Sequence, residues 1–171
     1  MPWFQKSLKL IKIKALMIKI NVITNDKNWF SYIKKPNYYL DKKTDKLNLK
    51  EKEFKKKYLF CTLLLSGNRE IKYLNKKFRK KNKVTDVLSF PFQTKKELKK
   101  KLKIKKEIYL GDIIINLKKV QKKIVLQDFK KEFDRLWIHG LLHLFGYEHK
   151  KDKDYKKMHQ IEKKYFNWVN D

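Results

Sequence analysis

The chain has 171 residues, and 46 Lys and Arg against 18 Asp and Glu give it a formal net charge of +28. That length is enough to bury one hydrophobic core, and a hydrophobic content of 42% argues against a fully disordered chain. No apolar run reaches the roughly 20 residues that a membrane helix needs, and lysines interrupt the apolar stretches near the N-terminus. We therefore expect neither a membrane span nor a secretory signal peptide. The lone Cys61 excludes an intramolecular disulfide and fits a reducing, cytoplasmic location.

The positive charge comes almost entirely from lysine, because only Arg69, Arg79 and Arg135 are arginines. Lys, Asn, Ile, Tyr and Phe all have A/T-rich codons, so a biased genome can enrich them without any ligand being involved. A surface of this charge nevertheless attracts polyanions such as RNA, DNA and anionic membranes. The charge therefore permits nucleic-acid binding without identifying it.

The N-terminal half shows two predicted strands with less regular segments between them. Residues 17–24 (MIKINVIT) alternate apolar side chains along one face, which predicts a strand. Residues 34–50 are rich in Lys, Asn, Tyr and Asp and include Pro36, and we interpret them as a surface insertion. Residues 48–57 have a helical composition. The short apolar run at 58–65 (YLFCTLLL) predicts a buried strand.

The middle of the chain predicts one helix and two further strands. Asn68 is a candidate N-cap for a helix that runs to Arg79. Residues 84–92 (VTDVLSFPF) and 107–116 (EIYLGDIIIN) both predict strands. Between them, residues 95–106 hold eight lysines in twelve positions, which we interpret as a solvated loop or a lysine-coated hairpin tip.

The C-terminal third predicts helices at residues 117–126, from Asp128 as N-cap to a stop at Gly146, and at residues 152–168. The whole order indicates an α+β fold, with a small mixed four-stranded sheet and helices packed on it. We expect residues 1–16 to be an N-terminal extension and residues 17–171 to form a single domain.

Three of the four histidines fall within residues 139–149, in the string HGLLHLFGYEH. His139 and His143 are four residues apart, so on a helix they lie on one face, about one turn apart. Gly146 allows the backbone to leave the helix through a left-handed residue and to bring His149 toward the same point. Three imidazoles suit Zn²⁺ and leave one coordination position for water. The sequence therefore predicts one zinc ion per chain.

Two other interpretations of the histidines remain open at this stage. The first is an aromatic-rich core helix that carries histidines by chance. The second is a protease, because the spacing is that of H-E-x-x-H-x-x-G-x-x-H metalloproteases. In those enzymes a Glu follows the first His and acts as general base, whereas this chain has Gly140 there. We interpret His159 as a surface or structural residue.

The string H-G-x-L-H-L-x-G-Y-[DE]-H resembles the signature of the YbeY family of bacterial and organellar endoribonucleases, the rRNA maturation factors. Four further blocks resemble the family in the same order. They are Leu74-Asn75 with Phe78-Arg79, Thr85-Asp86-Val87-Leu88-Ser89-Phe90-Pro91, Leu110-Gly111-Asp112-Ile113, and Met158 with Glu162. The histidine string is highly specific, and the last block is weak by itself.

The resemblance implies a zinc-dependent endoribonuclease that cuts single-stranded RNA during rRNA maturation, at the 3′ end of 16S rRNA. It implies that His139, His143 and His149 hold the zinc and that Arg79 is catalytic. The implied partners are rRNA precursors and the small ribosomal subunit. The chain departs from the family at Glu148, where an Asp is usual, and we can place no family counterpart for residues 1–16, 34–50 and 95–106.

For Arg79, a planar guanidinium can bind two phosphate oxygens at once, whereas the ordinary alternative is a surface salt bridge. For Thr85 and Asp86 we favour a turn closed by a local side-chain hydrogen bond, and for Asp112 a structural role. An assembly factor with a structural metal and an rRNA-binding surface remains a non-enzymatic alternative. Whether water or the RNA 2′-hydroxyl is the nucleophile is also open.

Overall fold

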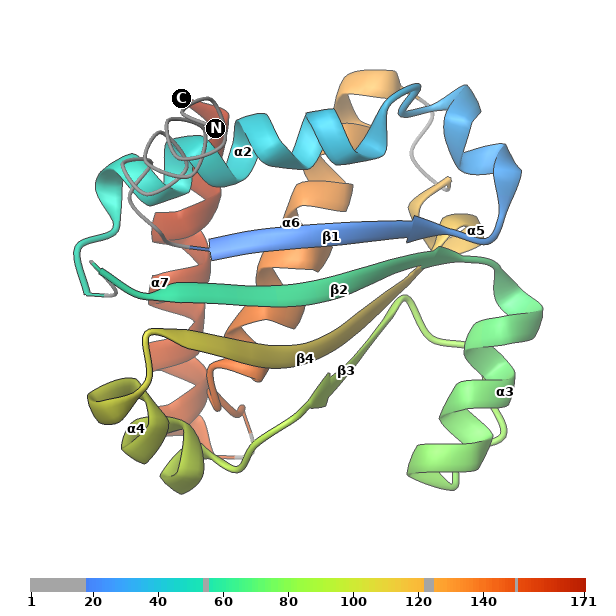
Figure 1. Ribbon diagram of the computed structural model, residues 1–171. Helices are drawn as coiled ribbons and strands as arrows, with labels where there is room; N and C mark the ends of the chain where they lie inside the picture. Colours follow the sequence, from blue (N-terminus) through green and yellow to red (C-terminus); the bar gives the residue numbers. More distant parts are fainter. Residues whose placement is uncertain (1–17, 54–55, 122–124, 150) are drawn as a thin grey trace, which may run out of the picture.

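Four strands form one mixed sheet in the order β1-β2-β4-β3 (Figure 1). The computed structural model describes residues 18–53, 56–121, 125–149 and 151–171. The strands are β1 (Ile18–Thr24), β2 (Tyr58–Ser66), β3 (Val87–Pro91) and β4 (Glu107–Asn116). β1, β2 and β4 run parallel, and β3 pairs antiparallel with β4 at one edge of the sheet.

Helices pack on both sides of this sheet, and more of them lie on one side than on the other. They are the 3₁₀ helix η1 (Lys27–Ser31) and the α-helices α2 (Pro36–Lys50), α3 (Asn68–Arg79), α4 (Lys95–Ile104), α5 (Leu117–Val120), α6 (Leu126–Leu144) and α7 (Asp152–Asn170). α2 contacts β1, α6 contacts β3 and β4, and α7 packs against α2 and α6. Figure 1 shows the sheet in front of α6 and α7. The predicted α+β class with a mixed four-stranded sheet is confirmed.

The alternation of side chains along β2 separates two hydrophobic clusters. Cys61, Leu63 and Leu65 are fully buried in the main core, beneath the helices. Leu64 points to the opposite side and packs in a smaller cluster built around Ile71 of α3. A strand has a side-chain period of two, so one strand supplies both clusters. α3 therefore lies across the sheet from α6.

The interpretation of residues 34–50 as a surface insertion is wrong, because most of them form helix α2. Leu40, Thr44 and Leu47 are buried along one side of α2 at helical spacing. The Thr44 hydroxyl is satisfied within the helix, since it donates a hydrogen bond of 2.9 Å to the carbonyl of Leu40. Pro36 occupies the first turn, where its missing N–H costs nothing.

The interpretation of residues 95–106 as a loop or hairpin tip is also wrong. Residues Lys95–Ile104 form helix α4, which Thr94 and Glu97 begin with a reciprocal capping box. Leu98 is buried in the main core and Leu102 packs against it one turn later. The lysines of α4 are thus carried on a helix that has an apolar side.

Several predicted boundaries also differ from the structure. The helical composition of residues 48–57 does not extend α2, which ends at Lys50. α6 begins at Leu126 with Val125 as its N-cap, and the predicted cap Asp128 lies in its first turn. Asn68 is the first residue of α3 rather than its cap. α5 and β3 are shorter than predicted. The predicted extension at residues 1–16 lies outside the described residues, as do parts of the predicted segments 17–24, 48–57 and 117–126.

None of the helices in the described ranges combines the length and the apolar character that a bilayer-spanning helix needs.

Candidate metal centre and active site

Helix α6 places two histidines side by side near its C-terminal end. His139 and His143 lie one turn apart and are both partly exposed, whereas their neighbours Leu141 and Leu142 are buried in the core. The Nε2 atoms of the two histidines are 3.1 Å apart. The apolar side of α6 thus fixes the helix on the sheet and turns both imidazoles toward one point.

Gly146 turns the chain so that a third histidine joins this pair. Its φ of +80° is left-handed, and the N–H of Tyr147 donates to the carbonyl of Leu142 at 3.0 Å while that of Gly146 donates to His143 at 2.9 Å. This pattern is a Schellman motif that closes the helix. The His149 ring centroid then lies 5.6 Å from that of His139 and 5.0 Å from that of His143. The predicted left-handed turn at Gly146 is confirmed.

The three side chains fit a tetrahedral metal ion. One nitrogen from each of His139, His143 and His149 lies within 4.8 Å of the others. Two imidazole nitrogens bound to one tetrahedral zinc are about 3.3 Å apart, since each Zn–N bond is ~2.0–2.1 Å. The observed 3.1 Å between His139 and His143 is close to that value. The histidines can therefore hold a metal with small side-chain movements.

His143 is already in the form that binds a metal. Its Nδ1 lies 2.9 Å from the carbonyl oxygen of Tyr147, an acceptor, so this nitrogen carries the proton and Nε2 keeps its lone pair. Burial, together with the neighbouring His139 and other positive charges, lowers the pKa of His143 to about 4. At neutral pH this ring needs no deprotonation before it binds an ion.

Gly140, between the two helical histidines, lies where α6 packs tightly against Ile113 of β4. A Cβ atom at this position would come within 2.7 Å of the Ile113 side chain. Any larger side chain at position 140 would therefore require Ile113 or α6 itself to shift. The glycine therefore allows close packing of α6 on β4.

Glu162 lies behind His139, on the side away from the other two rings. Its Oε1 atom is 3.6 Å from Nδ1 of His139 and 3.9 Å from Nη1 of Arg135. Burial alone would raise the pKa of Glu162, but His139 and Arg135 outweigh it and hold this pKa below its usual value. A carboxylate in this position can orient a metal-binding imidazole.

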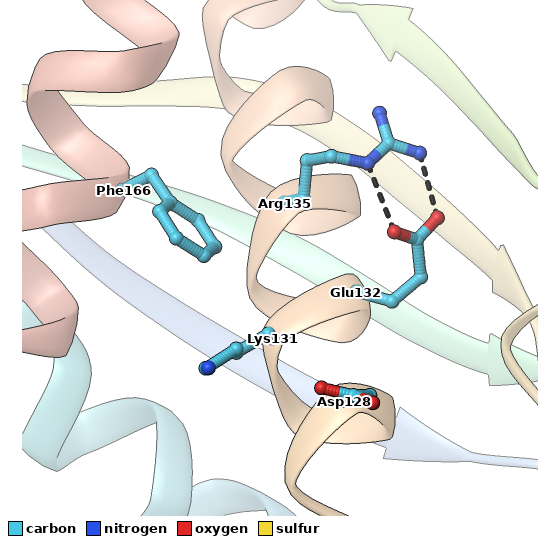
Figure 2. Close-up of a pocket in the computed structure, with 5 residues that line it drawn as sticks. All are labelled: Asp128, Lys131, Glu132, Arg135 and Phe166. Atoms are coloured by element: carbon cyan, nitrogen blue, oxygen red, sulfur yellow. Dashed lines mark hydrogen bonds and ion pairs between the residues drawn. The ribbon is translucent and has the colours of Figure 1, made fainter. Parts of the chain in front are cut away.

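Arg135 extends this arrangement along α6. Figure 2 shows its guanidinium paired with Glu132, and the two residues lie 2.7 Å apart at their closest atoms. They line an open pocket of about 220 Å³ between α6 and α7 that Phe166 borders on the α7 side. None of the three histidines lines this pocket. The pocket therefore adjoins the histidine group without being part of it.

Arg79 ends helix α3 and reaches the free edge of the sheet. Its Nη2 atom donates a hydrogen bond of 3.3 Å to the carbonyl of Ser89 in β3. The ion pairs found in the described ranges do not include Arg79, so the salt-bridge alternative gains no support there. Its positive charge is the smallest of the contributions that lower the pKa of His143.

The remaining candidate residues have local roles. The hydroxyl of Thr85 donates to Asp86 at 3.1 Å, and the same carboxylate accepts from the N–H of Val87 at 2.8 Å, as predicted for a turn before a strand. Asp112 accepts a 2.5 Å hydrogen bond from the Tyr109 hydroxyl. His159 is exposed on α7 and stacks on Tyr155, apart from the other three histidines.

Comparison with known proteins agrees with the sequence resemblance. The family model described as endoribonuclease YbeY matches residues 21–170. The chain belongs to the YbeY family. It is 44% identical to the endoribonuclease YbeY of Pelagibacter ubique over 150 residues, which cover 83% of this chain and 90% of that protein. The YbeY of Thermodesulfovibrio yellowstonii is 39% identical over 127 residues, covering 72% and 73%.

A solved structure is similar as well. The chain matches the solution structure of TM1509 from Thermotoga maritima with a TM-score of 0.50 and 27% identity, covering 90% of this chain and 89% of that one. The match to the YbeY model extends from β1 into α7 and so includes Arg79, Glu162 and all three clustered histidines.

Proposed function

We propose that the chain is a zinc-dependent endoribonuclease that cuts single-stranded RNA in the maturation of ribosomal RNA, at the 3′ end of 16S rRNA. In this proposal residues 17–171 form one catalytic domain that acts in the cytoplasm on rRNA precursors at the small ribosomal subunit. His139, His143 and His149 hold one zinc ion, and Arg79 binds the scissile phosphate.

One observation carries the proposal: three imidazoles, from His139, His143 and His149, converge on one point. Structural zinc sites usually fill four positions with protein ligands, often Cys. This group offers three histidines, and Cys61 is buried in the core, where burial raises the pKa of its thiol to about 12. A group of three favours a site with a position open to substrate.

The residues of the chain divide the work between them. The chemistry that zinc supplies in such a site is activation of water and stabilisation of charge on a phosphoryl oxygen. The carbonyl of Tyr147 orients the ring of His143. The carboxylate of Glu162 lies 3.6 Å from the buried Nδ1 of His139, which has no hydrogen-bond partner among the described residues, and a small movement would let it accept a hydrogen bond from that ring. Arg79 donates one hydrogen bond to the Ser89 carbonyl. Its remaining N–H groups can bind phosphate oxygens and offset charge in the transition state.

The packing of Gly140 opposes the peptidase alternative. A protease of this spacing needs a Glu at that position as general base. In this chain even a Cβ atom at residue 140 would lie 2.7 Å from Ile113. The chain thus lacks the carboxylate that peptide hydrolysis requires, and a Glu at position 140 would need Ile113 or α6 to shift.

Metal content tests the ligand assignment. Purified protein should contain about one zinc per chain, and His143→Ala should lose it, because two ligands remain. His159→Ala is the matched control and should keep the metal, since His159 lies outside the group. Metal retained in full by His143→Ala would overturn the assignment.

Cleavage assays on the same preparations test the activity. The parent protein should cut a single-stranded RNA and leave a duplex of the same sequence intact, and His143→Ala should cut neither. The product ends identify the nucleophile, because attack by the 2′-hydroxyl leaves a 2′,3′-cyclic phosphate and attack by water leaves none. Full zinc content without any RNA cleavage would favour the assembly-factor alternative.

A further inference from the structure

The side of the sheet opposite to α6 carries a group of aromatic rings that stay partly exposed. On β2, Tyr58 and Phe60 share a side with Leu64, whereas Cys61 lies on the side of the main core. α3 covers this side near the C-terminal end of β2, where Leu64 packs with Ile71. Toward the N-terminal end of β2, the two aromatic rings remain partly open to solvent.

A β-bulge adds two side chains of β4 to this surface. The register between β2 and β4 shifts after Phe60, so that Phe60 pairs with Tyr109 while Cys61 pairs with Gly111. The shift turns Tyr109 and Asp112 to the same side, although they are three residues apart. Their hydrogen bond of 2.5 Å agrees with this placement.

The rings form a continuous row. The centroid distances are 5.5 Å from Tyr58 to Phe60, 5.2 Å from Phe60 to Tyr109 and 5.5 Å from Tyr109 to Phe92. Phe92, one residue beyond β3, is 66% exposed. We call Tyr58, Phe60, Phe92 and Tyr109 the aromatic face. Aromatic side chains on an open sheet are a surface on which unpaired bases stack.

Positive charge accompanies these rings. The ammonium of Lys101 on α4 lies 5.7 Å from the centre of the Phe92 ring. Lys57 precedes Tyr58 and donates a hydrogen bond of 2.9 Å to the carbonyl of Lys105, which holds it at this end of the sheet. The combination of ring and cation suits bases and phosphates together. A second copy of the chain fits less well, because it brings the same charge of +28.

The aromatic face leads to the candidate active site along β3. Phe90, two residues before Phe92, points to the same side and packs edge-on against Phe78 at 5.3 Å between centroids. Phe78 directly precedes Arg79, which contacts the free edge of β3 at Ser89. An extended RNA strand that lies over β3 can therefore contact both the rings and Arg79.

We propose that the aromatic face is a docking surface for single-stranded RNA, where bases stack outside the point of cleavage. The inference rests on the proposed function and adds to it a second contact region on the far side of the sheet from α6. Asp112, exposed on the same side, offers a carboxylate that accepts hydrogen bonds from base amino groups.

Binding of a short RNA to altered full-length protein tests the proposal. Replacing Phe60 and Phe92 together by Leu keeps both side chains apolar and removes the planar rings. The Kd for a fluorescein-labelled 12-nucleotide oligouridine, read by anisotropy, should rise about ten- to a hundredfold, the range of losing one stacked base. The slope of log Kd against log salt should stay the same, because no phosphate contact is lost. Gels of the same samples confirm that the RNA is intact.

Two controls separate stacking from other effects. Replacing both residues by Tyr keeps planar rings and should keep the parent affinity. Tyr38→Leu removes an exposed ring on α2 that also has a lysine nearby, with the Lys42 ammonium 4.6 Å from the ring centre. This control should bind RNA like the parent. Thermal unfolding of each variant confirms that it folds.

The outcomes distinguish this inference from the proposed function. Parent-like RNA affinity in the Leu variant, with parental cleavage intact, overturns the aromatic face and leaves the function standing. Weaker binding by the Leu variant, with no RNA cleavage by any form, supports the face and counts against the function. A parent dimer that the Leu variant dissociates in sedimentation, without a change in RNA affinity, identifies a contact between copies and overturns the proposal.

Discussion

At Arg79, the effect of the planar guanidinium can be tested separately from the effect of the positive charge. The side chain leaves the end of α3 and contacts the backbone of Ser89 at the edge of β3. Lysine can replace its positive charge but not its planar fork of donors. Because nearly all other basic residues of this chain are lysines, a further lysine changes little in the overall attraction for RNA.

We therefore expect Arg79→Lys to reduce RNA cleavage by roughly ten- to a thousandfold, as for the loss of one preorganised donor. RNA affinity should remain near the parent value, because the many lysines still supply the general attraction for RNA. Zinc content should also remain, because Arg79 is not one of the residues that could hold the metal. Single-turnover cleavage and binding, measured on one preparation, check this. Cleavage at the parent rate would remove Arg79 from the site, and loss of folding would mark its bond to Ser89 as structural.

Glu162 shows what sequence could not reveal at the scale of single residues. The spacing of Met158 and Glu162 is a weak pattern, and no neighbouring residue in the sequence indicates which side chain Glu162 contacts. The partner is His139, more than twenty residues earlier, and the packing of α7 on α6 brings them together. The histidine spacing was visible because it is local to one helix and one turn.

At the scale of elements, the predicted strands were more accurate than the predicted surface segments. The strand at 107–116 has its predicted bounds, because its Ile and Tyr residues are typical of strands and polar residues mark both ends. α2 was missed because Thr44 occupies a buried position between Leu40 and Leu47 and so hides the apolar pattern. α4 was missed because its lysines outweighed a capping signal that the sequence does contain, Thr94 followed by Glu97.

The missed helix α2 is bound to α6 through Asp134, a fully buried carboxylate. Asp134 accepts hydrogen bonds from Tyr39 at 3.0 Å and from the indole of Trp137 at 2.9 Å, and it pairs with Lys43 at 2.8 Å. Burial raises its pKa, and the bonds from these three partners partly offset the rise. The group joins two elements that sequence reasoning did not connect.

We expect Asp134→Ala to lower the free energy of unfolding by about 3–5 kcal/mol, because it leaves the Tyr39 hydroxyl and the Trp137 indole without an acceptor and removes the charged partner of Lys43, which keeps only neutral acceptors near the end of α7. Urea unfolding followed by circular dichroism measures this. Asp41→Ala is the matched control, since its pair with Lys19 is about 40% exposed and should contribute less than about 1 kcal/mol. Equal effects of the two substitutions would show that Asp134 does not bind α2 to α6.

At the scale of the whole molecule, a net charge of +28 does not say where RNA binds. The positions of the lysine-rich helices α4 and α2 indicate better where RNA binds. α4 begins beside the histidine turn, because a Cβ atom at Gly146 would lie 3.0 Å from the Lys95 side chain. It also carries Lys101 to the ring of Phe92. α2 lies along β1, at the opposite edge of the sheet from β3 (Figure 1).

Two triple variants with equal changes in net charge test whether position matters. One replaces the exposed Lys96, Lys99 and Lys103 of α4 by Gln, and the other replaces the exposed Lys34, Lys42 and Lys46 in and before α2. The α4 variant should bind single-stranded RNA more weakly.

Its salt slope should fall by up to about two, since each lost phosphate contact removes about 0.7 from the slope for a single strand. The α2 variant should change the slope little, because those lysines lie far from the proposed path of the RNA. Zinc content should be that of the parent in both variants, as neither set contains a histidine of the cluster. Equal losses of affinity and slope in the two variants would show that the charge acts on RNA from all sides, and that the helix beside the histidines has no special part in binding.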